Sequence, residues 1–231
     1  MENVVEEEDF VEEDLSNQDF SGENLVEADF SSANLSGANF AGANLTGANF
    51  AGANLTGANL TGANLAGAEL TEATLQQATM VRAKAQEAEF GGADLSQADL
   101  TEAVLDSAWM EAATLDGAIL RYASLKGVQF EIGSMRDADV FFADFEGANL
   151  LETQLHGTNL SDALNLRGSA ISATKKFMDK FLADGDSVAW NRVTGGGLSA
   201  YQLVSGGPAN YQFFFEHEDD EEDEDDYDED D

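Results

Sequence analysis

Residues 38–67 read ANFAG-ANLTG-ANFAG-ANLTG-ANLTG-ANLAG, which is one five-residue unit repeated six times without a break. Each unit has a large apolar residue at its centre, an Ala two positions before it and a Gly two positions after it. The period extends in both directions, because 31 consecutive centres from Phe10 to Leu160 fall at every fifth position and 30 of them are Leu, Phe, Met or Val. A period of five matches neither the helical period of about 3.6 nor the strand period of about 2. Each unit is therefore predicted to be a short extended piece followed by a turn, for which Gly is suited.

Units such as Ala43-Asn44-Leu45-Thr46-Gly47 resemble the motif of the pentapeptide-repeat family. The resemblance implies an all-β solenoid: a right-handed, four-sided parallel β-helix in which four units make one coil. The central Leu or Phe and the small residue before it would point inward. A 20-residue coil would also stack like residues in columns, and the sequence has such columns of Phe (Phe10, Phe30, Phe50, Phe90 and Phe130) and of Asn (Asn24, Asn44 and Asn64).

The N-terminal segment, residues 1–23, holds 10 acids and no base. Its inward small positions carry Glu8, Glu13, Gln18 and Glu23 in place of Ala. Because charged carboxylates are costly to bury in a narrow apolar core, we expect an irregular first coil. The regular solenoid is then predicted to span residues 24–165.

Residues 166–215 have a different composition and are predicted to form a small α+β module. Residues 172–184 have the apolar spacing of a helix with Ser172 as its N-cap, and three strand-like runs separated by Gly-rich turns suit a β-meander (188–193, 198–204 and 211–215). The ends of a solenoid need covering, so the module is interpreted as a cap, with a partner-binding or dimerising element as the alternative. Residues 216–231 contain 14 acids and are predicted to be a disordered acidic tail, which either aids solubility or attracts a basic partner.

The overall composition excludes several classes of protein. The chain has 46 Asp and Glu against 10 Lys and Arg, a net charge of −36. Such an acidic protein is not expected to bind nucleic acid directly, because binding requires Lys and Arg residues that neutralise the phosphates. The absence of Cys excludes disulfides and thiolate metal sites. No export signal and no apolar run of about 18 residues is visible, so we expect a soluble cytoplasmic protein without a membrane partner.

No catalytic constellation is visible in the sequence. The chain has two His residues, His156 and His217, and neither has a Ser or Asp at the local spacing of a catalytic triad. A straight solenoid without inserted loops would also offer no pocket for a substrate. We therefore predict that the protein is not an enzyme and has no catalytic residues, cofactor or metal site.

Assigning the residues to the four implied sides gives a surface map with two candidate sites. One side carries acids and no base, and its partner-binding residues are predicted to be an acidic stripe (Glu69, Glu72, Glu89, Glu111, Glu131 and Glu152). Trp109 interrupts this side as a second candidate anchor, and Ile132 interrupts it as well. The opposite side carries large apolar residues (Ile119, Tyr122, Phe141 and Phe142). Either the C-terminal module folds back over them or they form a partner or dimer patch, and we favour the patch.

The sequence therefore favours a non-enzymatic protein-interaction scaffold or regulator that presents both surfaces on a rigid rod. Its partner would be an unidentified protein, basic or DNA-binding, and a homodimer through the C-terminal module or the apolar patch is a further alternative. The resemblance includes quinolone-resistance proteins, which implies a second hypothesis: a DNA mimic that binds a type II topoisomerase or another DNA-handling protein. Residues 30–68 are uncharged and 24 of the 46 acids lie in the two terminal segments, which argues against the mimic.

Overall fold

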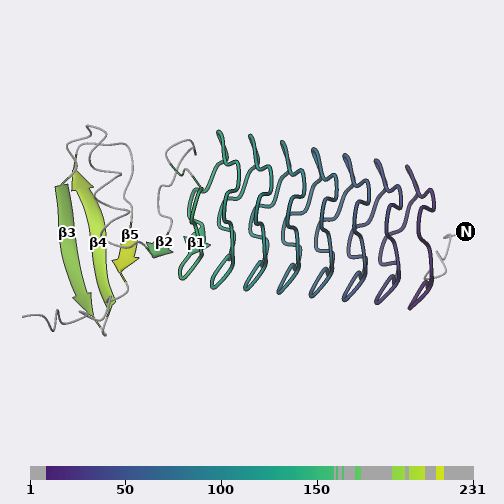
Figure 1. Ribbon diagram of the computed structural model, residues 1–231, viewed down its shortest axis with the longest axis horizontal. Helices are drawn as coiled ribbons and strands as arrows, with labels where there is room; N and C mark the ends of the chain where they lie inside the picture. Colours follow the sequence, from purple (N-terminus) through teal and green to yellow (C-terminus); the bar gives the residue numbers. More distant parts are fainter. Residues whose placement is uncertain are drawn as a thin grey trace, which may run out of the picture.

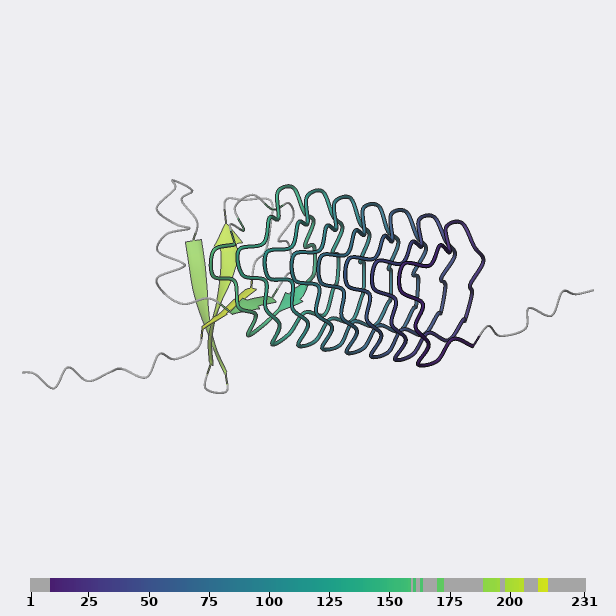
Figure 2. The ribbon, with the colours of Figure 1, turned by 45° about the vertical axis from the view of Figure 1, so that its right-hand side comes forward.

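A computed structural model gives the structure of the protein and describes residues 9–158, 160, 163, 170–172, 189–195, 198–205 and 212–215. Residues 9–158 wind into a straight rod whose coils stack along one axis (Figures 1 and 2). None of the described residues belongs to a helix long and apolar enough to span a membrane.

Each coil takes 20 residues, as the sequence predicts. The residue before each centre forms a parallel β-bridge with the residue 20 positions on, from Asp9 with Asp29 to Ser134 with Gln154. Backbone hydrogen bonds between coils follow the same repeat, and the N–H of Phe30 donates to the Asn49 carbonyl at 2.7 Å. Four such bridges in every 20 residues make the solenoid four-sided.

The turns between sides explain the Gly residues of the repeat. The second residue after each centre adopts the left-handed conformation, with φ of 67° at Gly42. In the described turns other than those after Phe130 and Met135, the N–H of the residue three positions after the centre donates to the carbonyl of the centre, as between Ala33 and Phe30 at 3.1 Å. Gly adopts this conformation without the steric cost that other residues incur.

The core contains the central large residues and the small residues that precede them. From Leu25 through Phe130 every central residue is fully or almost fully buried. The Phe columns stack face to face, with ring centroids 5.0 Å apart for Phe30 and Phe50 and 4.9 Å apart for Phe20 and Phe40. Phe rings from opposite sides also meet edge-on, with centroids 5.6 Å apart for Phe30 and Phe40, so the interior is narrow and the second inward residue is almost always Ala.

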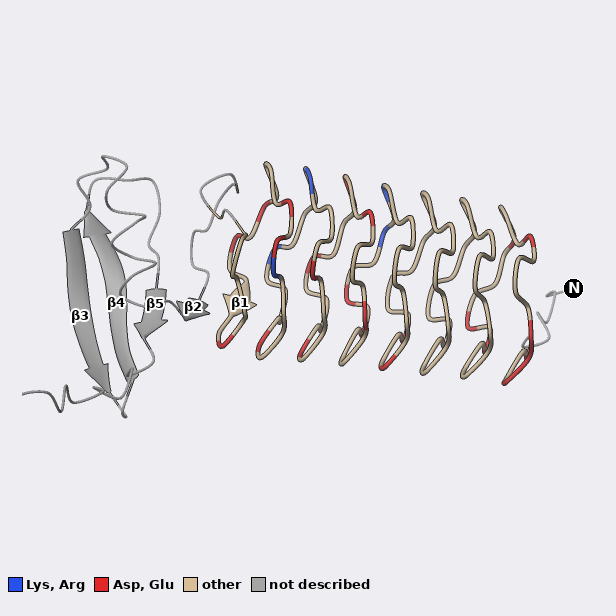
Figure 3. Ribbon diagram, in the orientation of Figure 1, with Lys and Arg blue, Asp and Glu red and all other residues tan. Residues whose placement is uncertain are grey.

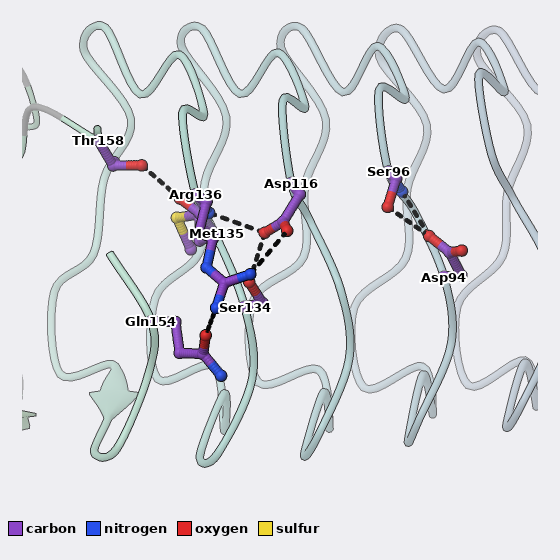
Figure 4. Close-up of polar contacts among 8 residues, drawn as sticks. All are labelled: Asp94, Ser96, Asp116, Ser134, Met135, Arg136, Gln154 and Thr158. Atoms are coloured by element: carbon purple, nitrogen blue, oxygen red, sulfur yellow. Dashed lines mark hydrogen bonds and ion pairs between the residues drawn. The ribbon is translucent and has the colours of Figure 1, made fainter. Parts of the chain in front are cut away.

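Polar ladders run along the outside of the coils. The side-chain amide of Asn44 donates from Nδ2 to Oδ1 of Asn24 at 2.8 Å, and that of Asn64 donates to Asn44 at 3.2 Å, which confirms the predicted Asn column. In the C-terminal half, charged and other polar side chains replace the Asn amides. On one side, the guanidinium of Arg136 lies between Asp116 and Gln154 (Figure 4). These contacts join neighbouring coils through side chains as well as through the backbone.

The first coil differs from our expectation. Residues 9–28 form the same bridges and turns as the coils above them, so their backbone is regular. The side chains of Glu13, Gln18 and Glu23 are exposed, whereas the core begins with Leu25 and Ala28. The carboxylates do not distort the coil because no coil lies below them among the described residues, and their side chains reach solvent at the end of the rod.

The turns after Phe130 and Met135 differ from the others, because side chains of the next coil take part in them. Thr153 and Thr158 occupy the small inward position and are buried. The hydroxyl of Thr153 donates to the Phe130 carbonyl at 2.6 Å, and that of Thr158 donates to the Met135 carbonyl (Figure 4). The Thr158 hydroxyl also accepts the Ala138 N–H at 3.1 Å. The two Thr hydroxyls thus donate to carbonyls of central residues that accept a backbone N–H in the other described turns.

A five-stranded sheet follows the rod, in the order β1-β2-β5-β4-β3. Strand β1 is part of the last coil, and β2 pairs with it and with β5 in parallel, while β3, β4 and β5 form an antiparallel meander. The bounds are Asn149–Leu150, Ala170–Ser172, Ala189–Gly195, Leu198–Ser205 and Gln212–Phe215 for β1 to β5.

The three predicted strand runs thus correspond to β3, β4 and β5. Ser172 is the last residue of β2, and an extended conformation is compatible with a helix N-cap, so its role as an N-cap stays a prediction. The exposed edge of a coil offers unpaired backbone groups, and the short segment 170–172 satisfies some of them by pairing with β1. The rest of the predicted helix, 173–184, and the predicted acidic tail, 216–231, lie outside the described residues.

Candidate functional site

The acidic stripe lies on one side of the rod, as predicted. Glu69 and Glu89 are bridge partners on successive coils, and the same column continues through Trp109, Gln129 and Asn149. Glu72, Glu111, Glu131 and Glu152 lie in the turns of this side, and all six stripe residues except the half-buried Glu131 are exposed. Acids recur along the lower edge of the rod in Figure 3, where Lys and Arg are absent.

The basic residues of the rod lie on its other three sides. Four of the five between residues 9 and 158 form ion pairs there: Arg82 with Glu102 at 2.8 Å, Arg121 with Asp139 at 2.5 Å, Lys126 with Asp144 at 3.2 Å, and Arg136 with Asp116 at 4.0 Å. By contrast, Glu69, Glu72, Glu89 and Glu111 have no ion-pair partner among the described residues. The negative potential of the stripe is therefore not neutralised locally.

The opposite side carries the apolar patch, which we call the aromatic patch (Ile119, Tyr122, Phe141 and Phe142). The ring centroids of Tyr122 and Phe142 are 5.7 Å apart in a nearly parallel arrangement, and Phe141 meets Phe142 edge-on at 4.5 Å. Each side chain nevertheless remains exposed, and Tyr122 is 55% accessible. The structure thus joins residues from two successive coils into one cluster that faces solvent.

An ion pair borders the aromatic patch and keeps its local charge balanced. The Arg121 guanidinium contacts Asp139 and also lies 5.7 Å from the centroid of the Phe141 ring, within the range of a cation–π interaction. The patch therefore combines aromatic rings with a charged donor and acceptor at its edge, a composition typical of protein–protein interfaces.

Two residues of the aromatic patch have an unfavourable backbone conformation. Tyr122 and Phe142 occupy the left-handed turn position, with φ of 58° and 57°. Ile132, on the side of the acidic stripe, does so with φ of 60° and is 53% exposed. This conformation costs a residue with a Cβ about 1–2 kcal/mol, and bulky residues rarely adopt it. Seventeen non-Gly residues among those described share this conformation, so Tyr122, Ile132 and Phe142 differ from the others by their large apolar side chains, which remain exposed.

We expect replacement of Ile132 by Gly to stabilise the rod. The Ile132→Gly change removes a β-branched side chain from a left-handed turn, and the free energy of unfolding should rise by about 1 kcal/mol. Ala112→Gly is the matched control, because Ala112 has the same turn position one coil earlier and a φ of 57°. Urea unfolding of the two variants should show the larger gain for Ile132→Gly; a loss of stability would contradict the strain at this position.

Trp109 lies within the acidic side as a separate exposed anchor. It is 53% exposed and pairs through its backbone with Glu89 on one neighbouring coil and Gln129 on the other. Its indole ring extends toward Gly91, where a Cβ added to the glycine would lie 4.0 Å from Cδ1 of the indole. A Cβ there would make only an ordinary van der Waals contact with the ring, which presents an aromatic surface among carboxylates.

Two groups on the flanking sides have shifted pKa values. Burial raises the pKa of the Asp94 carboxyl, but hydrogen bonds from the side chain and backbone N–H of Ser96 and from Gln76 outweigh it and hold the pKa below its ordinary value (Figure 4). The hydrogen bond to Asp144 and the charge of that carboxylate raise the pKa of Lys126. Both shifts arise from contacts that stabilise the coils, and they do not indicate acid–base chemistry.

No cluster of metal-ligating side chains is found in the described part of the chain. Within those residues, no group of three or more His, Asp or Glu is arranged to hold a metal ion. His156 is exposed in a turn of the last described coil. That the whole chain has neither a catalytic nor a metal site stays a prediction.

The sequence interpretation did not identify the backbone strain at Tyr122, Ile132 and Phe142. A signal was present: in the repeats of residues 38–67 the corresponding position is always Gly, so a bulky residue there departs from the repeat. The interpretation located these exposed residues on the two surfaces but did not recognise that all three are held in their turns at an energetic cost.

Comparison with known proteins bears on the family. The model of the family described as pentapeptide repeats matches the chain in eight copies, over residues 9–131 and 134–174. No curated protein matches the sequence significantly. HetL, a pentapeptide repeat protein involved in heterocyst differentiation regulation from the cyanobacterium Nostoc sp. strain PCC 7120, is 30% identical, and the match covers 71% of this chain and 80% of HetL with a TM-score of 0.39.

Two further solved structures are similar to the chain. A pentapeptide repeat protein from the thylakoid lumen of Arabidopsis thaliana is 38% identical, with 41% of this chain and 69% of that protein covered and a TM-score of 0.35. QnrB1, a plasmid-mediated fluoroquinolone resistance protein, is 21% identical, with 68% and 84% covered and a TM-score of 0.34.

The family assignment rests on the repeats themselves. The matched residues cover well over half of the chain and coincide with the part that forms the coils. Members of this family fold as right-handed β-helices and are generally structural or interaction proteins. The chain therefore belongs to the pentapeptide-repeat family.

Proposed function

We propose that this protein is a non-enzymatic interaction scaffold or regulator that binds a protein partner through the aromatic patch. The observation that carries the proposal is the exposed cluster of Tyr122, Phe141 and Phe142, in which two of the three rings occupy left-handed turns. Because polar residues such as Gln97 share this turn conformation, the proposal rests on the exposed aromatic surface of the cluster. Aromatic residues at the centre of an interface often contribute most of its binding energy.

The acidic stripe has a different role in this proposal. Its carboxylates are exposed and lie on a side without basic residues, so they would attract a basic partner over a distance. Such long-range attraction mainly raises the association rate and is weakened by salt. The stripe would therefore select a basic partner or a basic second face of the same partner, while the aromatic patch provides the contact that persists in salt.

Replacement of two rings of the aromatic patch should abolish partner binding. We expect Tyr122→Ser together with Phe142→Ser to weaken binding at least about 30-fold, because one buried aromatic anchor contributes about 2 kcal/mol or more. Ser is compatible with the turn, since Ser32 and Ser107 have the same left-handed conformation. The measurement is affinity capture from lysate of the source organism at raised salt, followed by quantitative mass spectrometry.

The matched control is Gln97→Ser, a change at the same turn position on another side of the rod, with φ of 60° at Gln97. It should leave capture unchanged. Equal capture of the same partner by the double variant and the unchanged protein would contradict a binding role for the aromatic patch.

A DNA mimic is the second candidate function, and the acids that recur in each coil from Glu69 to Glu152 favour it. Successive coils place carboxylates about 4.8 Å apart along the rod, compared with about 3.4 Å between phosphates of one DNA strand. The partner would then be a DNA-binding protein such as a type II topoisomerase. Under this hypothesis a duplex DNA competitor displaces the partner at moderate salt, and Glu89→Gln with Glu111→Gln weakens capture while the double Ser variant does not.

We also propose that the C-terminal sheet caps the rod. Its strand β2 pairs with β1 of the last coil, so the sheet continues one side of the solenoid beyond the repeats. Pairing of this kind satisfies backbone groups that would otherwise form an open edge. The alternative is that this sheet binds a second copy of the chain.

A further inference from the structure

The N-terminal end of the rod is an open sheet edge among the described residues. The first coil donates its hydrogen bonds to the second, but the N–H and C=O groups of Asp14, Asp19 and Asn24 that point away from the rod have no backbone partner in the described part of the chain. In every later coil the corresponding N–H is paired, as that of Asn34 is with the Glu13 carbonyl at 2.8 Å. Such an edge can pair with another strand.

These backbone groups are arranged so that they could hydrogen-bond with the same edge of a second copy of the chain. Each of the three residues presents one N–H and one C=O in the same direction, which is the arrangement of a hydrogen-bonded residue pair between antiparallel strands. Two rods related by a two-fold axis and meeting head to head could therefore bond through the residues that precede the centres. A contact of this kind is self-complementary and closed, so it would give a dimer and would not grow into a fibre.

The side chains at the small inward position act against this contact. Glu13 stands below Ala33 and Ala53 in one inward column, and Glu23 and Gln18 begin two others. They are exposed because no described coil lies below them, whereas Ala33 and Ala53 are 1% and 0% exposed inside the rod. Head-to-head pairing would enclose four carboxylates from the two copies in one narrow apolar interior, where charges are very costly.

We propose that Glu13, Gln18 and Glu23 form an end guard, a set of inward-facing polar side chains that prevents a second copy of the chain from pairing with the N-terminal edge. Inward-pointing charge at an edge is a means by which β-proteins avoid edge-to-edge association. The end guard would leave the sides of the rod, including the aromatic patch, as the surfaces available for binding. The inference does not depend on the proposed function.

The side-chain ladders end at the same coil. The amide of Asn34 donates to Asp14 at 2.9 Å, and that of Asn39 donates to Asp19 at 2.8 Å. These hydrogen bonds and those from Ser16 and Ser21 lower the pKa of the two carboxyls; the Ser side chains contribute most. Asp accepts but has no amide to donate onward, so the ladders do not extend beyond the first coil.

The test replaces the end guard in the full chain by the residue of the repeat: Glu13→Ala, Gln18→Ala and Glu23→Ala together. We expect sedimentation velocity over a range of concentrations to show a step to a dimer relative to the unchanged chain, and small-angle scattering to show a particle about twice as long. Ala occupies this position in the coils above, so the variant should fold, and its circular dichroism and unfolding midpoint verify this.

The control removes the same two charges from outward turn positions of the first coil, by Glu12→Ala and Glu27→Ala. It should sediment like the unchanged chain, and restoring Glu23 alone in the triple variant should return the protein to the unchanged state. Identical sedimentation of the folded triple variant and the unchanged chain would overturn the proposal. An equal step to a dimer in the control would also overturn it, because net charge would then explain the effect.

Discussion

Replacement of Ala53 by Glu should unfold the middle of the rod, although the same residue type is tolerated in the same column at its end. Ala53 is fully buried, and no charged or polar side chain is available inside the coil to pair with a carboxylate. An unpaired buried charge costs several kcal/mol, and the larger side chain adds overpacking. We expect Ala53→Glu to lower the free energy of unfolding by about 4 kcal/mol or more, measured by urea unfolding.

The control for this prediction is the reverse substitution, Glu13→Ala, in the same column two coils earlier. Glu13 is exposed, so its replacement should change the free energy of unfolding by no more than about 0.5 kcal/mol. An Ala53→Glu variant that unfolds at the urea concentration of the unchanged protein would show that the interior is neither as narrow nor as dry as the structure indicates.

Truncation of Phe50 should have an effect of comparable size. Its ring is fully buried, stacks on Phe30 at 5.0 Å and meets the edge of Phe40 at 5.8 Å. Phe50→Ala removes these contacts and leaves a cavity that rigid neighbouring coils cannot fill. The free energy of unfolding should fall by about 3–5 kcal/mol, as measured by chemical denaturation.

Phe10→Ala is the matched control for Phe50→Ala. Phe10 stacks on Phe30 at 4.7 Å in the same column, but it lies in the first coil and is only half-buried. Its loss should cost about 1–2 kcal/mol. Equal losses for the two Phe residues would contradict the prediction that the middle of the rod is packed more tightly than its end.

The fold of the rod could be predicted from the sequence because one constraint recurs in every unit. A large residue such as Leu45, the Ala two positions before it and the Gly two positions after it each have one place in the coil, so no long-range information is required. The Asn columns indicated the 20-residue coil independently, since the amides of Asn44 and Asn64 hydrogen-bond only if the coils have that length.

The ends of the rod were predicted less well, because their conformation depends on what lies next to them. The acids Glu13 and Glu23 indicated a distorted coil, but at an open end their side chains reach solvent and the backbone stays regular. Strand β2 was not predicted, because it forms by pairing with the edge of the last coil and has no local sequence pattern of its own. Neither outcome follows from local residue preferences.

The candidate surfaces could be located but not ranked from the sequence. The coil length placed Tyr122 and Phe142 on one side and Glu69 and Glu89 on the other, and the structure confirms these positions. The stacking geometry of the rings and the left-handed conformation beneath them required the backbone. The exposed, stacked rings make the aromatic patch the stronger candidate for the site of partner binding; the left-handed conformation does not, because Glu72 and Glu152 of the acidic stripe share it.

The most direct test of the central claim is comparative capture of a partner by the unchanged protein and by the Tyr122→Ser, Phe142→Ser variant, with a salt gradient and excess duplex DNA in parallel. A scaffold that binds through the aromatic patch predicts a partner that stays bound at high salt and in the presence of DNA and is lost from the variant. A partner that the variant retains, and that salt and DNA displace, would contradict this account and support binding through the acidic stripe.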